Sequence, residues 1–558
     1  MILIGLLIVA FSQISTLYGQ NQSYDYHPPL SIPLILAGNF GELRPNHFHM
    51  GLDFKTQGKE GHQLHAIEDG FISRVKISTY GYGKAVYIDH PNGKTSVYAH
   101  CSKFIGKLDS LVKEEQYKKQ QFEVELFFNK DILPIKKGEV FALSGNTGGS
   151  TAPHLHFEIR DSKTEVAQNP LIHGFPIADS RAPELRKIKF FSTNEQGYLV
   201  PGKAFETVIQ KTKNGYKISN DTIRIPADYC SNFGGIGIAI DAIDRLNGAE
   251  NQCGLYGSFL IVNGDTLFGQ QINEISFDHT RYINTHRDLS SSGTHYHKAF
   301  RNISNPLEIY TLKHKLGIIH AKPNDTLAVR YIGYDVAGNQ SQLDFQLVIL
   351  PGKIAADYNP SPETHWYPEE SYTRKAKNWE VIADSFTVYE PYPISTSNAP
   401  HYCSASTHLQ KRATVRMKLD NPTLPIEKYY LTIGKSPIKT RYIAGWLEGK
   451  TNSGGSLTIQ TDQIPPTIKP ASTSTIIKTK IVKFTISDNQ SGIDSYHLFI
   501  NDKWHLLEYE YKGSYVFFEV PENLEGENTF KLIVRDNCGN ETIWEKVLTV
   551  QLPTPPTP

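Results

Sequence analysis

Residues 144–158 read Ser-Gly-Asn-Thr-Gly-Gly-Ser-Thr-Ala-Pro-His-Leu-His-Phe-Glu, a glycine-rich loop that leads into alternating polar and apolar residues. Successive side chains of a β-strand point to opposite faces, so His154 and His156 are predicted to share one face of a sheet. Leu155 and Phe157 then lie on the opposite, core-facing side. Burial of that side fixes the backbone, which holds the two imidazoles next to each other on the polar face.

Two upstream segments repeat this pattern. In HMGLDF, which starts at His49, alternation places His49 and Asp53 on one face and the three large apolar residues on the core side. In VYAHC, which starts at Val97, the same rule places Tyr98 and His100 on the polar face and the other residues inward. Three strands are therefore predicted to present His or Asp on one face of a sheet.

This set of side chains points to metal chemistry. Two imidazoles and one carboxylate, with one open position, form a catalytic zinc site. The site keeps a net positive charge, which lowers the pKa of a bound water to about 7. Further histidines are then free for proton transfer and for stabilising an oxyanion. The residues predict a zinc hydrolase, and periodicity leaves open whether His154 or His156 is the ligand.

The surrounding sequence predicts one β domain over residues 30–178. Short strands alternate with glycine turns, which is typical of an antiparallel sheet. The exception is residues 107–120 (KLDSLVKEEQYKKQ), whose apolar residues have helical spacing and predict a surface helix. Alternating apolar residues at 122–128 then predict a strand, so residues 102–134 form an insert.

The rest of the chain predicts further β domains. Two segments each run from an acidic turn through an N-G or N-D hairpin to a D-x-x-G-N turn, at 335–339 and at 536–540. Such spacing is typical of immunoglobulin-like β-sandwiches. The expected units are Ig-like domains at 183–355 and 467–551, a β-rich domain at 356–466 and a Pro/Thr tail at 552–558.

Composition agrees with this all-β-dominated fold class. At about 150 residues per domain, 558 residues correspond to roughly four domains. The 42 Gly, 32 Pro, 30 Tyr and 27 Phe favour a loop-rich β protein over helical bundles. Lys plus Arg and Asp plus Glu each number 57, and this balance argues against a nucleic-acid partner.

The cysteines and the first segment indicate compartment and chemistry. The five cysteines include no C-x-x-C pair, which excludes a cysteine-rich zinc knuckle and a thioredoxin-like redox site. The apolar run at residues 1–10 is too short to cross a bilayer and predicts a signal peptide over residues 1–19. No later stretch reaches 18 apolar residues, so an exported protein without a transmembrane segment is expected.

Several motifs together resemble the lysostaphin/LytM-type zinc endopeptidases, which cleave peptide cross-links of bacterial peptidoglycan. They occur in the family's order and read RPNHFHMGLD from Arg44, GYG from Gly81, VYAH from Val97 and SGNTGGSTAPHLHFE from Ser144. The resemblance implies an antiparallel sheet with a groove that has the catalytic site at its floor and loops as its walls. It also implies a place in the periplasm or cell envelope.

The resemblance implies a role for each residue of the site. His49, Asp53 and His156 would bind one Zn2+ per chain. His154 would be the general base that activates the zinc-bound water for attack on the amide. His100 would assist as a proton relay or an oxyanion stabiliser. Cross-links between D-alanine and a diamino acid are the expected target, although sequence alone leaves the bond open.

Two other functions stay open at this point. Some relatives lack ligands and act as non-catalytic adaptors that activate other wall hydrolases. A zinc protease acting on secreted proteins, with the Ig-like segments binding envelope proteins, is the third reading. Residues 102–134 exceed the family's usual connection and are expected to wall the groove or touch the sugar chain of the substrate. Latency and oligomeric state are not indicated by the sequence.

Overall fold

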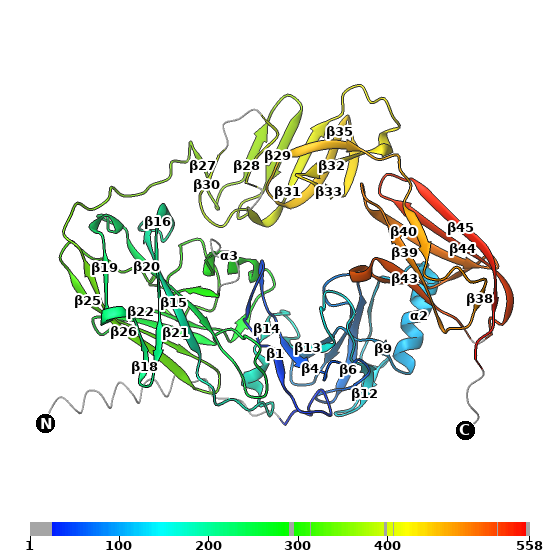
Figure 1. The fold of residues 1–558 in the computed structure, drawn as a ribbon, viewed down its shortest axis with the longest axis horizontal. Helices are drawn as coiled ribbons and strands as arrows, with labels where there is room; N and C mark the ends of the chain where they lie inside the picture. The colour runs from blue at the N-terminus through cyan, green and yellow to red at the C-terminus, as the bar shows by residue number, and fades with distance from the viewer. Residues whose placement is uncertain are drawn as a thin grey trace.

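The computed structural model describes residues 25–288, 295–312, 314–394, 399–404, 407–521 and 523–553. The predicted signal peptide at 1–19 lies outside these residues, as does residue 554 onward in the Pro/Thr tail. Figure 1 shows the chain running through a ring of β-rich units, from blue at the bottom through green and yellow to red beside helix α2 (Lys107–Lys119). The all-β-dominated fold class is confirmed.

The N-terminal domain is built on one large, mainly antiparallel sheet. Within the described residues, its main path is β1-β4-β13-β8-β7-β6-β10, with β11, β14 and β23 attached beside it. The bounds are β1 (Leu36–Gly38), β4 (Leu52–Lys55), β6 (Gly70–Ile77), β7 (Lys84–Asp89), β8 (Lys94–Ala99), β10 (Val124–Phe127), β11 (Pro134–Ile135), β13 (His154–Asp161), β14 (Ala167–Gln168) and β23 (Glu274–Ile275). Smaller sheets are formed by β2 (Leu43–Arg44) with β3 (His47–Phe48), and by β5 (Gln63–His65), β12 (Val140–Leu143) and β9 (Lys103–Phe104).

The predicted alternation holds on β4 and β13. Leu155 and Phe157 are fully buried and pack in the same core as Leu52 and Phe54. Burial of each such side chain contributes about 1.5–3 kcal/mol, which favours this register over one shifted by a residue. The regular strand begins at Leu52, so His49 lies just before it.

The predicted faces of residues 97–99 are wrong, whereas Cys101 packs in the main core and His100 lies beside His154, as expected. Tyr98 is fully buried in the main core, where its ring packs edge-on against Phe157 and its hydroxyl accepts a hydrogen bond from the Ile67 amide at 3.1 Å. Val97 and Ala99 lie in a separate cluster on the other face. His100 lies beyond the end of β8 and has a φ of 61°, in the left-handed region, so strand alternation does not apply to it.

The insert at 102–134 forms α2 and β10, as its periodicity predicts. In the main sheet β10 lies at the far edge, separated from β13 by β8, β7 and β6. Leu108 and Val112 bury the inner face of α2, while Tyr117 meets Trp504 of the last domain with ring centroids 5.1 Å apart. The insert therefore extends the sheet on the side away from the candidate site.

The second domain consists of two facing sheets that pack through pairs such as Phe190 and Phe345. One contains β15 (Glu184–Thr193), β16 (Leu199–Val208), β20 (Gly235–Ile243) and β24 (Tyr296–Lys298). The other contains β17 (Gln210–Thr212), β18 (Gly215–Lys217), β19 (Thr222–Ile225), β21 (Gly257–Val262), β22 (Asp265–Gln271), β25 (Thr326–Tyr334) and β26 (Gln340–Ile349). The short helix α3 covers Ile283–His286.

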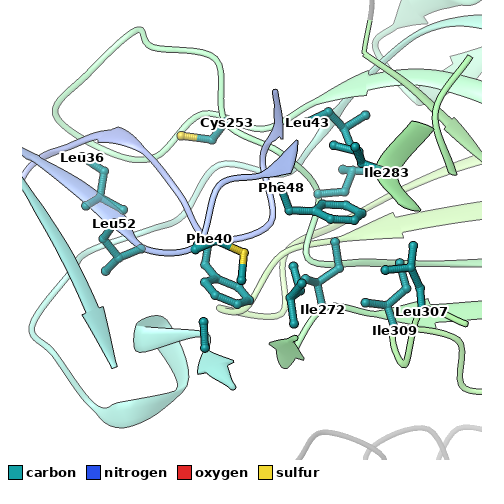
Figure 2. Packing of buried hydrophobic residues seen from close by; sticks show 14 of the residues in the cluster. Leu36, Phe40, Leu43, Phe48, Leu52, Cys253, Ile272, Ile283, Leu307 and Ile309 are labelled. Atoms are coloured by element: carbon teal, nitrogen blue, oxygen red, sulfur yellow. The ribbon is translucent and has the colours of Figure 1, made fainter. Parts of the chain in front are cut away.

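The first and second domains share a continuous hydrophobic core. Figure 2 shows Phe40 and Phe48 of the first domain beside Ile272 and Ile283 of the second. The backbone is joined as well, because β14 pairs with β13 on one side and with β23 of the second domain on the other. The two sequence segments are therefore joined by a sheet as well as by a linker.

The third and fourth domains have hydrophobic cores of their own. The third contains β27 (His365–Trp366), β28 (Tyr372–Lys375), β29 (Trp379–Ala383), β30 (Tyr392–Pro393), β31 (His408–Lys418), β32 (Tyr429–Ile433), β33 (Ser436–Ile438), β34 (Thr440–Ile443), β35 (Trp446–Ser453) and β36 (Leu457–Thr461). The fourth contains β37 (Thr467–Pro470), β38 (Ile476–Ile477), β39 (Ile481–Ser487), β40 (Ile493–Ile500), β41 (Lys503–His505), β42 (Glu508–Glu510), β43 (Tyr515–Glu519), β44 (Gly526–Asp536) and β45 (Glu541–Val550).

The two D-x-x-G-N turns have the same geometry. Asp335 accepts hydrogen bonds from the backbone and side-chain amides of Asn339 at 2.9 and 2.8 Å. Asp536 accepts the equivalent bonds from Asn540 at 2.8 and 2.7 Å. The repeated motif therefore forms the same turn in the second and fourth domains, and the Ig-like assignment itself stays a prediction.

The fold also shows the state of the cysteines and the character of the helices. The five cysteines are all buried free thiols, so Cys230 and Cys253 do not form a disulfide. Among the residues that the structure describes, no helix has both the length and the apolar character needed to cross a bilayer.

Candidate metal centre

Three side chains from β13 and the start of β4 meet at one point on the polar face of the main sheet. His49 Nε2 lies 3.0 Å from Asp53 Oδ1 and 3.0 Å from His156 Nδ1. His156 Nδ1 lies 2.9 Å from the same Asp53 oxygen. Neighbouring ligands around a tetrahedral zinc ion are roughly 3.3 Å apart, so the three atoms have nearly the required spacing.

Backbone register produces this meeting. β4 and β13 pair antiparallel with Asp53 directly opposite His156. Gly51 lets the chain between His49 and Asp53 pass over β13, because a Cβ at this position would come within 2.4 Å of Phe157 O. The spacing H-x-x-x-D therefore requires a glycine at its centre in this fold.

Hydrogen bonds on the outer side of each imidazole determine which nitrogen is free. His49 Nδ1 lies 2.7 Å from the Asn39 carbonyl, and His156 Nε2 lies 2.8 Å from Glu158 Oε1. Each of these nitrogens must therefore donate its proton outward, which leaves His49 Nε2 and His156 Nδ1 as electron-pair donors beside Asp53 Oδ1. Two imidazoles, both neutral once His156 has released its Nδ1 proton, and a carboxylate facing one another are the donor set that fits a divalent zinc ion.

The partners of this set are buried and charged. Glu158 is fully buried and accepts from Arg160 Nε at 2.7 Å and from the Tyr82 hydroxyl at 2.5 Å. On the other side, Arg44 Nη2 donates to Asp53 Oδ2 at 2.6 Å. Asp53 is thus itself a candidate ligand, and Glu158 orients the candidate ligand His156. In both cases a guanidinium group balances the negative charge of the carboxylate.

Two further histidines lie beside the three donors. His154 Nε2 is 3.4 Å from Asp53 Oδ1, and its Nδ1 is 2.8 Å from Ala152 O and 3.0 Å from Ser150 Oγ. His100 Nδ1 is 2.8 Å from Thr147 O. The proton on Nδ1 is therefore held by a loop carbonyl in both rings, and Nε2 is the free nitrogen. The two ring centroids are 4.7 Å apart.

The pKa values follow from burial and from these contacts. Burial lowers the pKa of His49 to about 4 and that of His100 to about 3, so both rings are neutral at pH 7. Burial also opposes the charge of His156, but hydrogen bonds with Asp53 and Glu158 outweigh it and raise its pKa to about 9. For Glu158, burial is outweighed mainly by Arg160, and the pKa falls to about 2.

A hollow of about 690 Å³ opens beside these side chains. Its lining includes Arg44, Lys55, His100, His154 and, from the second domain, Asn251. Of the described residues that line it, none belongs to the insert at 102–134. The insert therefore does not line this hollow, and β10 lies at the opposite edge of the sheet, while a contact of the insert with the groove beyond it or with the sugar chain stays a prediction.

The structure brings together all five site residues that the sequence singles out. Glu158 and Arg44 were quoted in the motifs without a role. Strand periodicity could have identified Glu158, because it follows His156 by two positions on the same face. Nothing in the local pattern indicates that Arg44 reaches Asp53, because β2 and β4 belong to different sheets.

Comparison with known families gives one match. Residues 47–117 match the family described as Peptidase family M23. This segment contains His49, Asp53 and His100 and ends before the two histidines of β13. The pairing of β13 with β4 places those two histidines beside the first three residues. The resemblance seen in the sequence motifs is confirmed for the N-terminal domain.

Individual relatives cover only a part of this chain. An uncharacterized metalloprotease of Haemophilus influenzae is 34% identical over 150 residues, which are 27% of this chain and 25% of that protein. The DD-carboxypeptidase/endopeptidase Mpg of Neisseria meningitidis is 34% identical over 128 residues, 23% of each chain. The catalytic domain of lysostaphin from Staphylococcus simulans is 26% identical, with 24% of this chain and 86% of that chain covered and a TM-score of 0.18. The chain thus spans about a quarter of the length of these curated relatives.

Proposed function

We propose, from the Peptidase family M23 match at residues 47–117, that this chain is an exported zinc endopeptidase that hydrolyses peptide cross-links of bacterial peptidoglycan. The observation that carries the proposal is the meeting of His49 Nε2, Asp53 Oδ1 and His156 Nδ1 within 3.0 Å of one another. The similarity to a protein of Vibrio cholerae named Peptidoglycan DD-endopeptidase ShyB, 26% identical over 166 residues, supports peptidoglycan as the substrate. Its place of action would be the periplasm or cell envelope.

His49, Asp53 and His156 would hold the zinc ion, one per chain. When bound, zinc would polarise the scissile carbonyl and lower the pKa of a coordinated water. Glu158 and the Asn39 carbonyl keep the two ligand imidazoles in the correct tautomer.

His154 and His100 supply the proton transfers. His154 Nε2 is the free ring nitrogen next to Asp53, so it can take a proton at that atom and return it to the leaving amine. His100 presents its Nε2 from the other side and serves as relay, or as oxyanion stabiliser once it is protonated. A 690 Å³ hollow lined by both rings is large enough for a peptide segment.

The adaptor alternative is disfavoured because the ligand set and both additional histidines are complete. A protease that acts on secreted proteins remains the second candidate, since the hollow does not itself select a cross-linked peptide. The deciding experiment incubates the full chain, after zinc loading, with purified peptidoglycan sacculi and with a panel of unfolded proteins. Mass spectrometry of the released fragments identifies the bond.

Release of muropeptides with a newly cut stem-peptide bond is the expected result, abolished by a zinc chelator and restored by added zinc. Cleavage of the proteins alone would replace the proposal with the second candidate. A zinc-loaded protein that cleaves neither substrate yet stimulates another wall hydrolase would establish the adaptor.

A further inference from the structure

The last domain contacts the N-terminal domain next to the candidate metal centre. Figure 1 shows the orange and red strands beside the blue and cyan domain, which closes the ring of domains. The contact segment is β42 and the short 3-10 turn that follows it, residues 508–513. Glu508 Oε2 pairs with Lys84 Nζ at 2.7 Å, and the rings of Tyr511 and Tyr80 lie 4.7 Å apart.

Lys512 makes the contact nearest to the site. Its ammonium group donates to Ser150 O at 3.1 Å and also to Asn146 O. Both carbonyls belong to the glycine-rich loop that precedes β13. One positive charge from a residue more than 350 positions away in sequence therefore bridges two points of this loop.

The bridged loop is the one that orients both additional histidines. Thr147 lies between the two bridged carbonyls, and its own carbonyl lies 2.8 Å from His100 Nδ1. Ser150 carries one of the bridged carbonyls, and its hydroxyl lies 3.0 Å from His154 Nδ1. A shift of this loop would therefore turn both rings, while His49, Asp53 and Glu158 are held by other contacts.

The other described hydrogen bonds that hold the loop to neighbouring segments come from neutral groups. Gly145, Gly148 and Gly149 fall within it, and glycine increases the number of backbone conformations open to a chain. Its described anchors to the neighbouring loop are backbone and hydroxyl contacts, such as Gly149 N to Gly81 O at 2.7 Å and Lys84 N to Thr147 Oγ1 at 3.0 Å. A charged donor with two acceptors adds a stronger restraint than either neutral contact.

We propose that Lys512 is a positioning residue for the reaction, which acts through the Asn146 and Ser150 carbonyls to orient His154 and His100. The last domain then supports the glycine-rich loop that precedes β13, and its role differs from that of a spacer or of an arm that binds the cell wall. This inference rests on the proposed function for its kinetic consequence, while the restraint on the loop can be measured without any activity.

The test compares Lys512→Met, which removes the charge and keeps the stem, with Lys512→Arg, which retains a donor. The matched control is Lys546→Met, an exposed lysine on β45, which belongs to a different sheet of the last domain from β42. All are made in the full chain and loaded with zinc. We expect Lys512→Met to lower kcat on muropeptides about 10- to 100-fold with KM and zinc content unchanged. Lys512→Arg should recover most of kcat, and the control should equal wild type.

A second arm measures amide hydrogen exchange over residues 146–151. Faster exchange in Lys512→Met than in Lys546→Met is expected. A double-mutant cycle with Ser150→Ala should show that the two losses in kcat do not add, because both act through the same contact to His154. Additive losses would contradict this route.

The inference and the proposed function fail in different ways. If wild type is inactive on every muropeptide, the proposed function is wrong, and exchange over 146–151 still decides whether Lys512 restrains the loop. If wild type is active and Lys512→Met keeps full kcat, or loses kcat together with its zinc, the positioning role is wrong.

Discussion

The carboxylate of Asp53 contacts Arg44 on one side and the candidate metal centre on the other. Arg44 Nη2 lies 2.6 Å from Asp53 Oδ2, while Oδ1 of the same group faces His49 and His156. The guanidinium fixes the rotation of the carboxylate, so that one oxygen is directed at the site. This outer contact should therefore affect the affinity of the site for zinc.

Arg44→Met should weaken zinc binding about 10- to 100-fold, because the carboxylate loses the partner that orients it. Competition with a chromogenic chelator measures the affinity. Arg330→Met is the control, since Arg330 forms an exposed ion pair with Asp344 in the second domain. Equal zinc affinity in Arg44→Met and wild type would show that Asp53 needs no such support.

Substitution of the two histidines of β13 should separate metal binding from catalysis. His156→Ala removes one of the three donors and is expected to lose both zinc and activity. His154→Ala should retain about one zinc per chain and lose activity, because the His154 ring lies beside the three donors and its Nε2 atom can accept and release a proton. Metal content by mass spectrometry, measured beside muropeptide release, checks both. Zinc loss in His154→Ala would reverse the two roles.

Glu158→Gln should be the most destabilising of these changes. It removes the buried partner of Arg160 and leaves it only the exposed Glu165 carboxylate at 3.4 Å, and breaking a buried ion pair costs about 3–5 kcal/mol. Tyr82→Phe removes only one neutral donor to the same group and should cost about 0.5–1.5 kcal/mol. Thermal unfolding of the zinc-free proteins compares them, and a similar loss in both variants would contradict the importance of the charge.

Asp244 should make stability depend on pH. Burial, followed by the neighbouring Asp179 and Asp335 carboxylates, raises its pKa to about 8. An unfolded aspartate releases its proton near about pH 4, so between these values the folded state binds more protons and unfolding becomes easier as pH rises. Asp244→Asn removes this proton release and should lose less stability between about pH 5 and pH 8 than wild type.

Urea unfolding at the two pH values, in buffer free of divalent cations, makes the comparison. Asp221→Asn, an exposed carboxylate of the same domain, serves as the control and should follow wild type. If Asp244→Asn loses as much stability as wild type over this range, the carboxylate is ionised in the folded protein.

Sequence periodicity predicted the faces of the site residues correctly on strands that have one buried face. His154 and His156 alternate with Leu155 and Phe157, and any other register would expose those apolar residues. The same rule failed at Tyr98, because a left-handed φ at His100 ends the alternation and no glycine or proline marks the change. A residue with positive φ other than glycine is held by its surroundings, here by the Tyr82 and Thr147 carbonyls.

Contacts between distant segments were the other part that could not be predicted. Lys512 meets Ser150 because the last domain packs on the first, and Arg44 reaches Asp53, nine positions further along the chain, from a different sheet of the same domain. Local patterns contain no information on which loop a domain will touch. The sequence motifs therefore indicated the ligands, and the groups that support them became visible only in the fold.

The strand pair between Ala167 of β14 and Ile275 of β23 changes what can be removed from this protein. A polypeptide cut after residue 178 would lose the partner of β14 and would expose Phe40 and Phe48 to solvent. Exposed strand edges and apolar surfaces promote aggregation. The smallest soluble fragment that keeps the metal centre intact should therefore extend to the end of β26. Fragments that stop at residue 178 are expected to precipitate.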